Sequence, residues 1–111
     1  MEKRVELNRL LDFYGGLLTE HRREIVRMYL EEDLSLQEVA DSMNITRQGV
    51  HDAVNKAQKQ LEGYEEKLGL VKRYQFLKRA LDECEIALSE KTDDAVERAL
   101  SLIKEIRQNE R

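Results

Sequence analysis

The sequence predicts an all-α protein, in which a helix-turn-helix core is followed by a long C-terminal helical hairpin. Three observations support this fold class. The 111 residues include no proline and 38% of them are charged, a composition that favours helices. Apolar residues recur at intervals of three and four along most of the chain, which is the spacing of one helix face. No segment shows the alternation of β-branched and polar residues that is typical of a strand.

The first two helices are predicted from apolar spacing and from the residues that can begin and end them. One helix should cover residues 3–14 and end at Gly15-Gly16. Its apolar stripe would consist of Val5, Leu7, Leu10 and Leu11. A second helix should follow Thr19, which can cap it, and continue to about residue 31. Its buried residues would be Ile25, Val26, Leu30 and either Met28 or Tyr29.

The segment from residue 35 to residue 61 has the pattern of a helix-turn-helix. Ser35 and Glu38 can form a capping box, so a helix should begin at residue 36. Asn44 should end it, because Asn tolerates the left-handed conformation better than other residues with a side chain. Thr46 can then cap the next helix. The apolar positions of this motif are Val39, Ala40, Met43, Ile45, Val50, Val54, Ala57 and Leu61.

The C-terminal half predicts the helical hairpin. The helix that begins at residue 47 has no stop before Gly63 or Gly69, and its apolar positions should continue through Tyr64 and Leu68. The stripe of the following helix would be Leu70, Tyr74, Leu77, Leu81, Cys84 and Leu88, and that of the last helix Val96, Leu100, Ile103 and Ile106. We expect a helix-turn-helix domain over residues 1–62 and a helical extension over 63–111, packed as one compact unit. The extension could serve for dimerisation or docking, since its apolar stripes invite a homodimer.

The second helix of the motif has residue types that suit the major groove of DNA. Arg pairs well with guanine edges and Gln or Asn with adenine, whereas an aspartate would repel phosphate or accept from a cytosine amino group. The candidate nucleic-acid-binding residues are Arg47, Gln48, His51, Asp52, Asn55, Lys56 and Lys59. The net charge of −4 weakens this hypothesis, because DNA affinity comes from basic side chains that displace counterions from phosphates. The densest basic cluster lies elsewhere, at Lys67, Lys72, Arg73, Lys78 and Arg79.

The sequence contains little that would support catalysis, metal binding or membrane insertion. The two histidines lie thirty residues apart, and no glycine-rich phosphate loop is visible. His51 is better explained as a solvated or capping residue than as a ligand. The single cysteine, Cys84, can neither close an internal disulfide nor build a metal site alone. No apolar window approaches a membrane span. We therefore expect a cytoplasmic protein that is not an enzyme and has no cofactor, metal or membrane partner.

Two resemblances follow from these residues. The pattern EVA at 38–40, NITR at 44–47, Val50 and Val54 resembles region 4 of bacterial sigma factors, where a glycine usually replaces Asn44. The whole chain, from NRLLDFYGGLL to TRQGVHDAV, resembles the YlxM family of small bacterial helix-turn-helix proteins more closely. Genes of that family typically lie beside those of the signal recognition particle GTPase or its receptor. The resemblance therefore implies a regulator in or beside the signal recognition particle pathway.

Three functions remain open from the sequence. The favoured one is an accessory of the signal recognition particle, which contacts its GTPase or its RNA and modulates GTP turnover without hydrolysing GTP itself. The second is a duplex DNA-binding transcriptional regulator that uses Arg47, Gln48, His51 and Asn55. The third is a protein interaction module whose C-terminal hairpin docks a partner helix.

Overall fold

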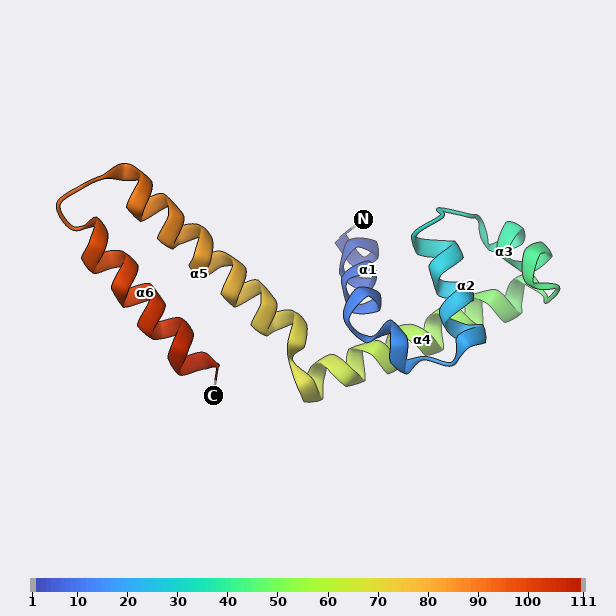
Figure 1. Cartoon of the computed structure of the whole chain (residues 1–111). Coiled ribbons are helices and arrows are strands. Elements are labelled where there is room, and N and C mark those ends of the chain that lie inside the picture. Colours follow the sequence, from blue (N-terminus) through green and yellow to red (C-terminus); the bar gives the residue numbers. More distant parts are fainter. Residues whose placement is uncertain (1, 111) are drawn as a thin grey trace. The chain divides into compact units, whose positions relative to one another are not determined.

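The computed structural model describes residues 2–110, and within that range it contains only helices and their connections (Figure 1). The elements are α1 (Glu2–Tyr14), the short 3-10 helix η1 (Gly15–Leu17), α2 (Glu20–Leu30), α3 (Leu36–Met43), α4 (Arg47–Leu68), α5 (Leu70–Glu90) and α6 (Ala95–Asn109). The predicted all-α class is confirmed.

The chain divides into two compact units, residues 1–71 and 72–111. The division falls after residue 71 rather than after residue 62, and there are two units rather than the single one expected from the sequence. The later boundary has a physical reason, because Val71 is buried in the core of the N-terminal unit and Tyr64 packs against that core. The first two residues of α5, Leu70 and Val71, therefore belong to the N-terminal unit.

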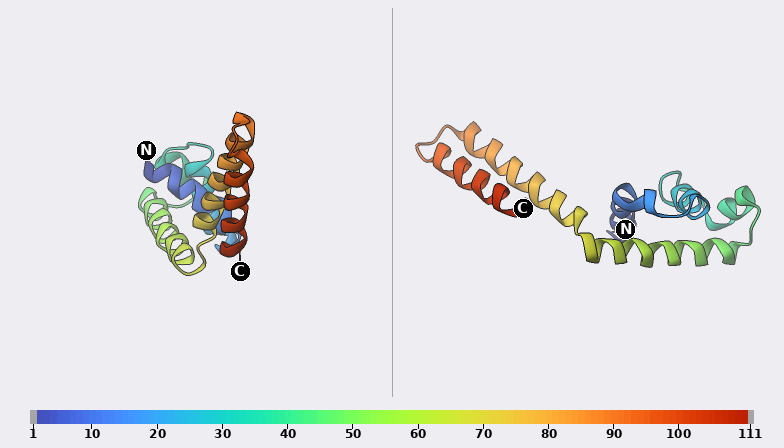
Figure 2. Two further views of the ribbon diagram at one scale, coloured as in Figure 1. Left: turned by 90° about the vertical axis from the view of Figure 1, so that its left-hand side faces the viewer. Right: turned by 60° about the horizontal axis from the view of Figure 1, so that its bottom comes forward.

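The core of the N-terminal unit forms along α4, which α1, α2 and α3 all contact (Figure 2). One buried cluster joins α1 and α2 to the second half of α4 through Leu7, Leu10, Leu11, Tyr14, Leu18, Val26, Leu30, Ala57, Leu61 and Val71. A second cluster joins α2 and α3 to the first half of α4 through Ile25, Val39, Ala40, Val50 and Val54. The unit is therefore held together by one long helix that contributes to both clusters.

Most of the predicted core residues of this unit are buried or half-buried. Val5 and Leu68 are the exceptions, at 58% and 56% exposed. Two positions along a helix correspond to a rotation of about 200°, so Val5 and the buried Leu7 lie on opposite sides of α1. The predicted stripe of α1 was wrong at this position, and Tyr14 completes the buried face instead. Both Met28 and Tyr29 are half-buried at the edge of the second cluster.

The start and end signals of the helix-turn-helix are confirmed. The Glu38 amide donates to Ser35 Oγ and the Ser35 amide donates to Glu38 Oε1, each at 3.0 Å, which closes the capping box. The hydrogen bond from the Ser35 amide holds the pKa of the Glu38 carboxyl below its ordinary value. Asn44 adopts the left-handed conformation, with φ 57° and ψ 44°. Thr46 Oγ1 accepts from the Gly49 amide at 2.9 Å and begins α4.

The left-handed turn at Asn44 leads to a stability prediction. Asn44→Val should lower the free energy of unfolding by about 1 to 2 kcal/mol, because a β-branched side chain is strained at positive φ. Asn44→Gly is the matched control and should leave stability unchanged or slightly raised. Urea denaturation followed by circular dichroism measures both. Equal stability of the two variants would contradict this account of the turn.

The end of α4 is tied to α1 by one buried tyrosine. The helix continues through Gly63 and stops at Gly69, which has φ 63°. The Tyr14 hydroxyl donates to Glu65 Oε1 at 2.5 Å and accepts from the Leu70 amide at 2.9 Å. Glu65 Oε1 also accepts from the Val71 amide at 3.0 Å. Two amides that begin α5 are thereby satisfied, since the first amides of a helix have no partner within it.

The C-terminal unit is an antiparallel hairpin of α5 and α6 that packs through small side chains. Its buried residues are Ala80, Cys84, Ala87, Ala95 and Ala99. Cys84 Sγ donates to the Ala99 carbonyl at 3.7 Å, which shows how closely the helices approach. The predicted stripes were wrong here except at Cys84 and the half-buried Leu77 and Ile106. Their other members are exposed, namely Leu70, Tyr74, Leu81, Leu88, Val96, Leu100 and Ile103.

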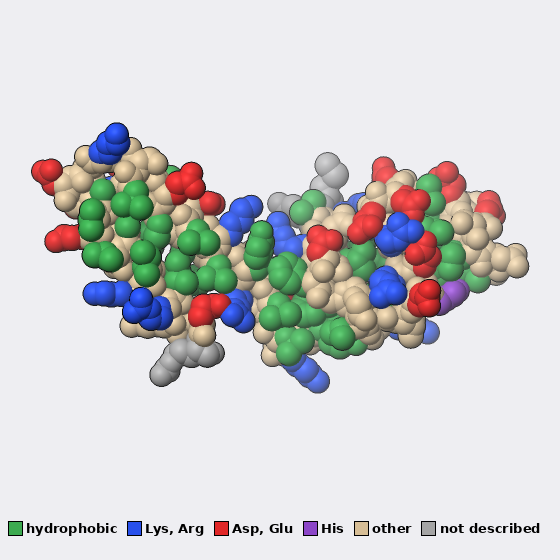
Figure 3. Space-filling model, viewed as in Figure 1, with side chains coloured by type: hydrophobic (Ala, Val, Ile, Leu, Met, Phe, Trp, Pro, Cys, Tyr) green, Lys and Arg blue, Asp and Glu red, His purple; other side chains and the backbone are tan. Residues whose placement is uncertain are grey.

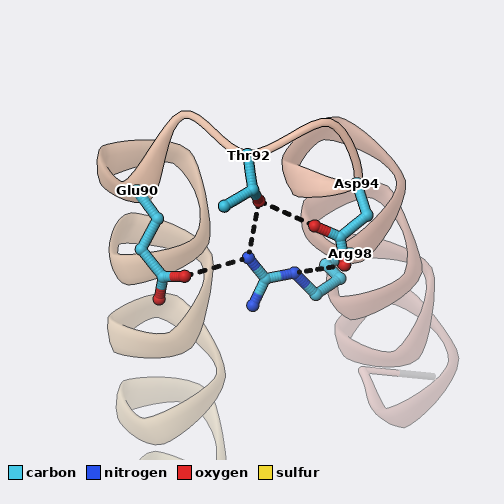
Figure 4. A network of polar contacts seen from close by, with 4 residues as sticks. All are labelled: Glu90, Thr92, Asp94 and Arg98. Carbon is cyan, nitrogen blue, oxygen red and sulfur yellow. Dashed lines mark hydrogen bonds and ion pairs between the residues drawn. The ribbon is translucent and has the colours of Figure 1, made fainter.

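Both ends of the hairpin are closed by ionic contacts. At the turn, the Arg98 guanidinium lies 3.3 Å from Glu90 and 3.2 Å from Asp94, and it donates to Thr92 Oγ1 at 3.1 Å (Figure 4). The Thr92 hydroxyl donates to Asp94 Oδ1 at 2.7 Å, and this bond holds the pKa of Asp94 below its ordinary value. At the other end, Arg73 forms an ion pair with Glu110. These exposed contacts join the two helices at both ends of the hairpin, whereas the buried small residues between the helices form its core.

Candidate nucleic-acid interface

The first half of α4 presents a polar surface on the side opposite to the core. Val50, Val54 and Ala57 are buried, and they follow one another at the spacing of one helix face. The seven residues that the sequence proposed for nucleic-acid binding are all exposed, namely Arg47, Gln48, His51, Asp52, Asn55, Lys56 and Lys59. We call these seven residues the α4 surface. Helical geometry places them together on the solvent side of α4.

Several side chains of the α4 surface contact one another. Gln48 Nε2 donates to Asp52 Oδ1 at 3.0 Å. His51 Nδ1 lies 3.4 Å from Asn55 Nδ2 and 3.9 Å from Asp52 Oδ1. These pairs are exposed and one helical turn or less apart, so water or a base edge can replace them at small cost. Asp52 therefore orients Gln48 on the free surface without fixing it there.

The basic residues of the α4 surface remain available for an anionic partner. Arg47, Lys56 and Lys59 form no ion pair with any residue that the structure describes. Arg47 lies in the first turn of α4, and the two lysines lie further along the same helix. The arrangement offers three positive charges around the exposed half of one helix, with Asp52 as the opposing charge. Arg47 and Lys56, nine positions apart, lie at opposite edges of that half.

The unit around this surface is acidic. Residues 1–71 contain ten Lys and Arg but fourteen Asp and Glu, so the whole net charge of −4 belongs to this part of the chain. On α3, Glu38 belongs to the capping box and Asp41 accepts from Gln37 at 2.9 Å. The first helix of a helix-turn-helix crosses the phosphate backbone when the motif binds DNA. An acidic α3 therefore weakens phosphate contact in the usual docking geometry.

One residue beside the α4 surface could not be identified from the sequence. Arg4, on α1, donates to the Tyr29 carbonyl at 2.7 Å and to Asp33 at 3.0 Å, and its guanidinium lies 4.7 Å from the centre of the Tyr29 ring. Together with His51 and Asn55 it lines a cavity of about 200 Å³. No local pattern indicates this neighbour, because α1 reaches α4 only through tertiary packing.

The basic cluster of the sequence does not form a single surface. Arg73 is paired with Glu110. Lys72 and Lys78 are six positions apart on α5, and Arg79 follows Lys78 directly, so these side chains point to different sides of the helix. Lys67 belongs to α4, in the other unit. The cluster is therefore not a second candidate interface.

Among residues 4–110, no three His, Cys, Asp or Glu side chains are grouped so that they could hold a metal ion. No helix within the same range combines the length and the apolar character needed to cross a membrane.

Comparison with known proteins places the chain in a family. Residues 1–103 match the family model described as "Putative helix-turn-helix protein, YlxM / p13 like". A UPF0122 protein of Symbiobacterium thermophilum is 42% identical over 95 residues, which cover 86% of this chain and 89% of that protein. A UPF0122 protein of Shouchella clausii is 39% identical over 106 residues (96% and 95%), and one of Listeria innocua is 36% identical over 107 residues (95% and 97%).

The family model spans both units, because its match begins at residue 1 and extends into α6. The relatives from Shouchella and Listeria are matched over nearly their whole length. The helix-turn-helix and the C-terminal hairpin are thus parts of one shared architecture. The chain belongs to the YlxM / p13-like family of helix-turn-helix proteins.

Proposed function

We propose that this protein is a regulator without catalytic activity that contacts nucleic acid through the α4 surface. One observation carries the proposal: the seven polar residues share the exposed side of a helix that is positioned by a complete helix-turn-helix. Helix-turn-helix proteins insert the beginning of their second helix into the major groove of duplex DNA. A regulator of this kind would act in the cytoplasm.

The residues would have different roles in such a complex. Arg47, in the first turn, is suited to a guanine edge, and Asn55 is suited to adenine. Gln48 could also read adenine once it leaves Asp52. Lys56 and Lys59 would contact phosphate, which adds affinity without sequence preference. Specific recognition would therefore depend on Arg47 and Asn55, and the salt dependence of binding on the two lysines.

Replacement of Arg47 tests this assignment. Arg47→Ala should weaken binding to a preferred duplex about 10-fold or more and relax the preference at one base pair, because a bidentate contact to guanine is lost. Fluorescence anisotropy with labelled duplexes measures the affinity. Lys67→Ala removes a positive charge near the other end of α4 and serves as the matched control, with little expected effect. Unchanged affinity of Arg47→Ala would rule out this role of Arg47.

A second candidate function is a role in the signal recognition particle pathway. The charge of the N-terminal unit supports this function. The unit is net acidic and therefore poorly suited to contact the phosphates of DNA. This candidate function also rests on the resemblance to a family whose genes neighbour those of the particle's GTPase. In this case the protein would contact the GTPase or the particle's RNA and change the rate of GTP turnover.

One titration distinguishes the two candidates. The labelled protein is titrated at two salt concentrations with random duplex DNA and with the assembled signal recognition particle of a Gram-positive bacterium. Tight binding to DNA that falls steeply with salt, without binding to the particle, supports the first function. Binding to the particle alone, with a change in its GTP turnover, supports the second. Binding to neither partner would contradict both.

A further inference from the structure

The C-terminal unit has one side that is covered with large apolar side chains. On α5, Leu81 and Leu88 are 58% and 53% exposed. On α6, Val96, Leu100 and Ile103 are 63%, 51% and 43% exposed. Spacings of three, four and seven keep the members of each row on one side of their helix. We call these five residues the hairpin face.

The two rows form one continuous surface. Each row borders the seam of small residues through which α5 packs on α6, and in an antiparallel pair both rows emerge on the same side of that seam. Figure 3 shows hydrophobic side chains gathered over α5 and α6 in this view. The other side differs, because Glu83, Arg98 and Ser101 there line a hollow of about 400 Å³ together with Ile86, Ala87 and Leu102. The hairpin is thus amphipathic.

The size of the hairpin face fits an interface between two copies. Five large side chains that are about half exposed, with the half-exposed Tyr74 in the same row, amount to about 600 Å² of mostly apolar surface. Two copies packed face to face would bury about 1,200 Å², which is the lower end of the range for specific interfaces. A face of this size on a unit of forty residues is costly to leave in water.

The charges of the hairpin indicate how a second copy would be oriented. The open end, residues 72–81 and 102–110, contains six Lys and Arg against two Asp and Glu. The end with the turn, residues 82–101, contains two Lys and Arg against seven Asp and Glu. The hairpin is therefore positive at one end and negative at the other. A copy turned end over end would place opposite charges together, whereas a copy running in the same direction would place like charges together.

We infer that the hairpin face binds the hairpin face of a second copy of this chain, end over end, so that the two hairpins form an antiparallel four-helix bundle. The two-fold axis crosses the hairpin near residue 81, where the sign of the charge changes. In this arrangement α5 faces α5 of the other copy. Lys78 and Glu85, which border the face and are exposed, then lie beside their oppositely charged counterparts.

The first experiment measures the oligomeric state of the full chain. Sedimentation equilibrium should show a dimer whose dissociation constant rises with salt, because the charges at the two ends attract each other. Leu81→Glu should raise that constant at least about 100-fold, since the new carboxylate would be buried against apolar surface. Ile86→Glu is the matched control on the other side of α5, with an equally exposed side chain, and should leave the dimer intact.

A second variant and circular dichroism spectra distinguish the loss of the interface from a loss of folding. Leu100→Gln should also weaken the dimer, and circular dichroism must show unchanged helix content for Leu81→Glu, Leu100→Gln and Ile86→Glu. A wild-type chain that remains monomeric at all concentrations would overturn the inference. A dimer that is insensitive to Leu81→Glu and to Leu100→Gln would overturn it as well.

Cross-linking tests the orientation. In a Cys84→Ala background, one protein carries Lys78→Cys and a second carries Glu85→Cys. A short bismaleimide should join the two different proteins when they are mixed, because residue 78 of one copy lies beside residue 85 of the other. Cross-links that form mainly within each protein alone, 78 to 78 or 85 to 85, would contradict the end-over-end arrangement.

Discussion

Leu61→Ala is expected to lower the free energy of unfolding by about 3 kcal/mol, within the range observed for buried leucines. The Leu61 side chain is fully buried, at 0% exposure, in the cluster where α1 and α2 meet α4. Truncation removes apolar contacts and leaves a cavity, because α1 and α2 are held apart by the other members of the cluster. Urea denaturation at fixed protein concentration measures the change.

Leu68→Ala is the matched control for this prediction. It is the same substitution in the same helix, but Leu68 is 56% exposed. Its expected effect is within about 0.5 kcal/mol, as for most surface positions. If both substitutions changed stability equally, the cluster around Leu61 would not form the core of the N-terminal unit.

Tyr14→Phe is expected to cost about 2 kcal/mol, although it removes only one oxygen atom. The hydroxyl bridges Glu65 and the Leu70 amide, and the tyrosine side chain is 1% exposed. Without the hydroxyl, the Leu70 amide loses its acceptor and Glu65 loses a donor. Hydrogen exchange of the Leu70 and Val71 amides should become faster, in parallel with the loss of stability in urea.

The behaviour at high pH gives an independent check on Tyr14. Burial, followed by the hydrogen bond to Glu65, raises the pKa of the Tyr14 hydroxyl above its ordinary value of 10.0. The stability that the protonated hydroxyl contributes is therefore complete below pH 10 and is lost as the pH rises through the higher pKa of the folded state. The Phe variant should lose less stability in this range.

Tyr64→Phe is the control for the loss of a tyrosine hydroxyl. Tyr64 is half-buried, and its hydroxyl accepts from Gln60 at 2.8 Å and donates to the Leu17 carbonyl at 3.5 Å. Water can replace both bonds, so the expected change is below about 0.5 kcal/mol. A similar loss in both variants would contradict the special role of the buried Tyr14 hydroxyl.

The helix-turn-helix could be predicted from sequence because its signals are local. The capping pair Ser35 and Glu38, the left-handed Asn44 and the cap at Thr46 act within a few residues of each helix end. The apolar spacing of α4 identifies its buried side, and the remaining polar positions form the exposed α4 surface. The helix ends and the buried side of α4 both depend on backbone geometry that neighbouring residues determine.

The packing of the hairpin could not be predicted in the same way. α5 carries two rows at helical spacing, one of large residues such as Leu81 and Leu88, and one that includes Ala80, Cys84 and Ala87. Hydrophobicity favours the first row as the buried one. Close approach of α6 requires the second row, and nothing local in the sequence decides between them. The position of Arg4 beside the α4 surface could not be predicted for a similar reason, because it depends on how α1 packs against α4.

The link between Tyr14 and Leu70 also has a consequence for synthesis on the ribosome. The two residues are 56 positions apart in the chain. Helices α1 to α3 emerge first but cannot complete their core until α4 and the start of α5 have left the exit tunnel. Until then their apolar sides remain open to chaperones, as in other nascent domains. A transcript truncated before codon 70 would yield a chain without this closing contact, and such a product should be degraded rapidly.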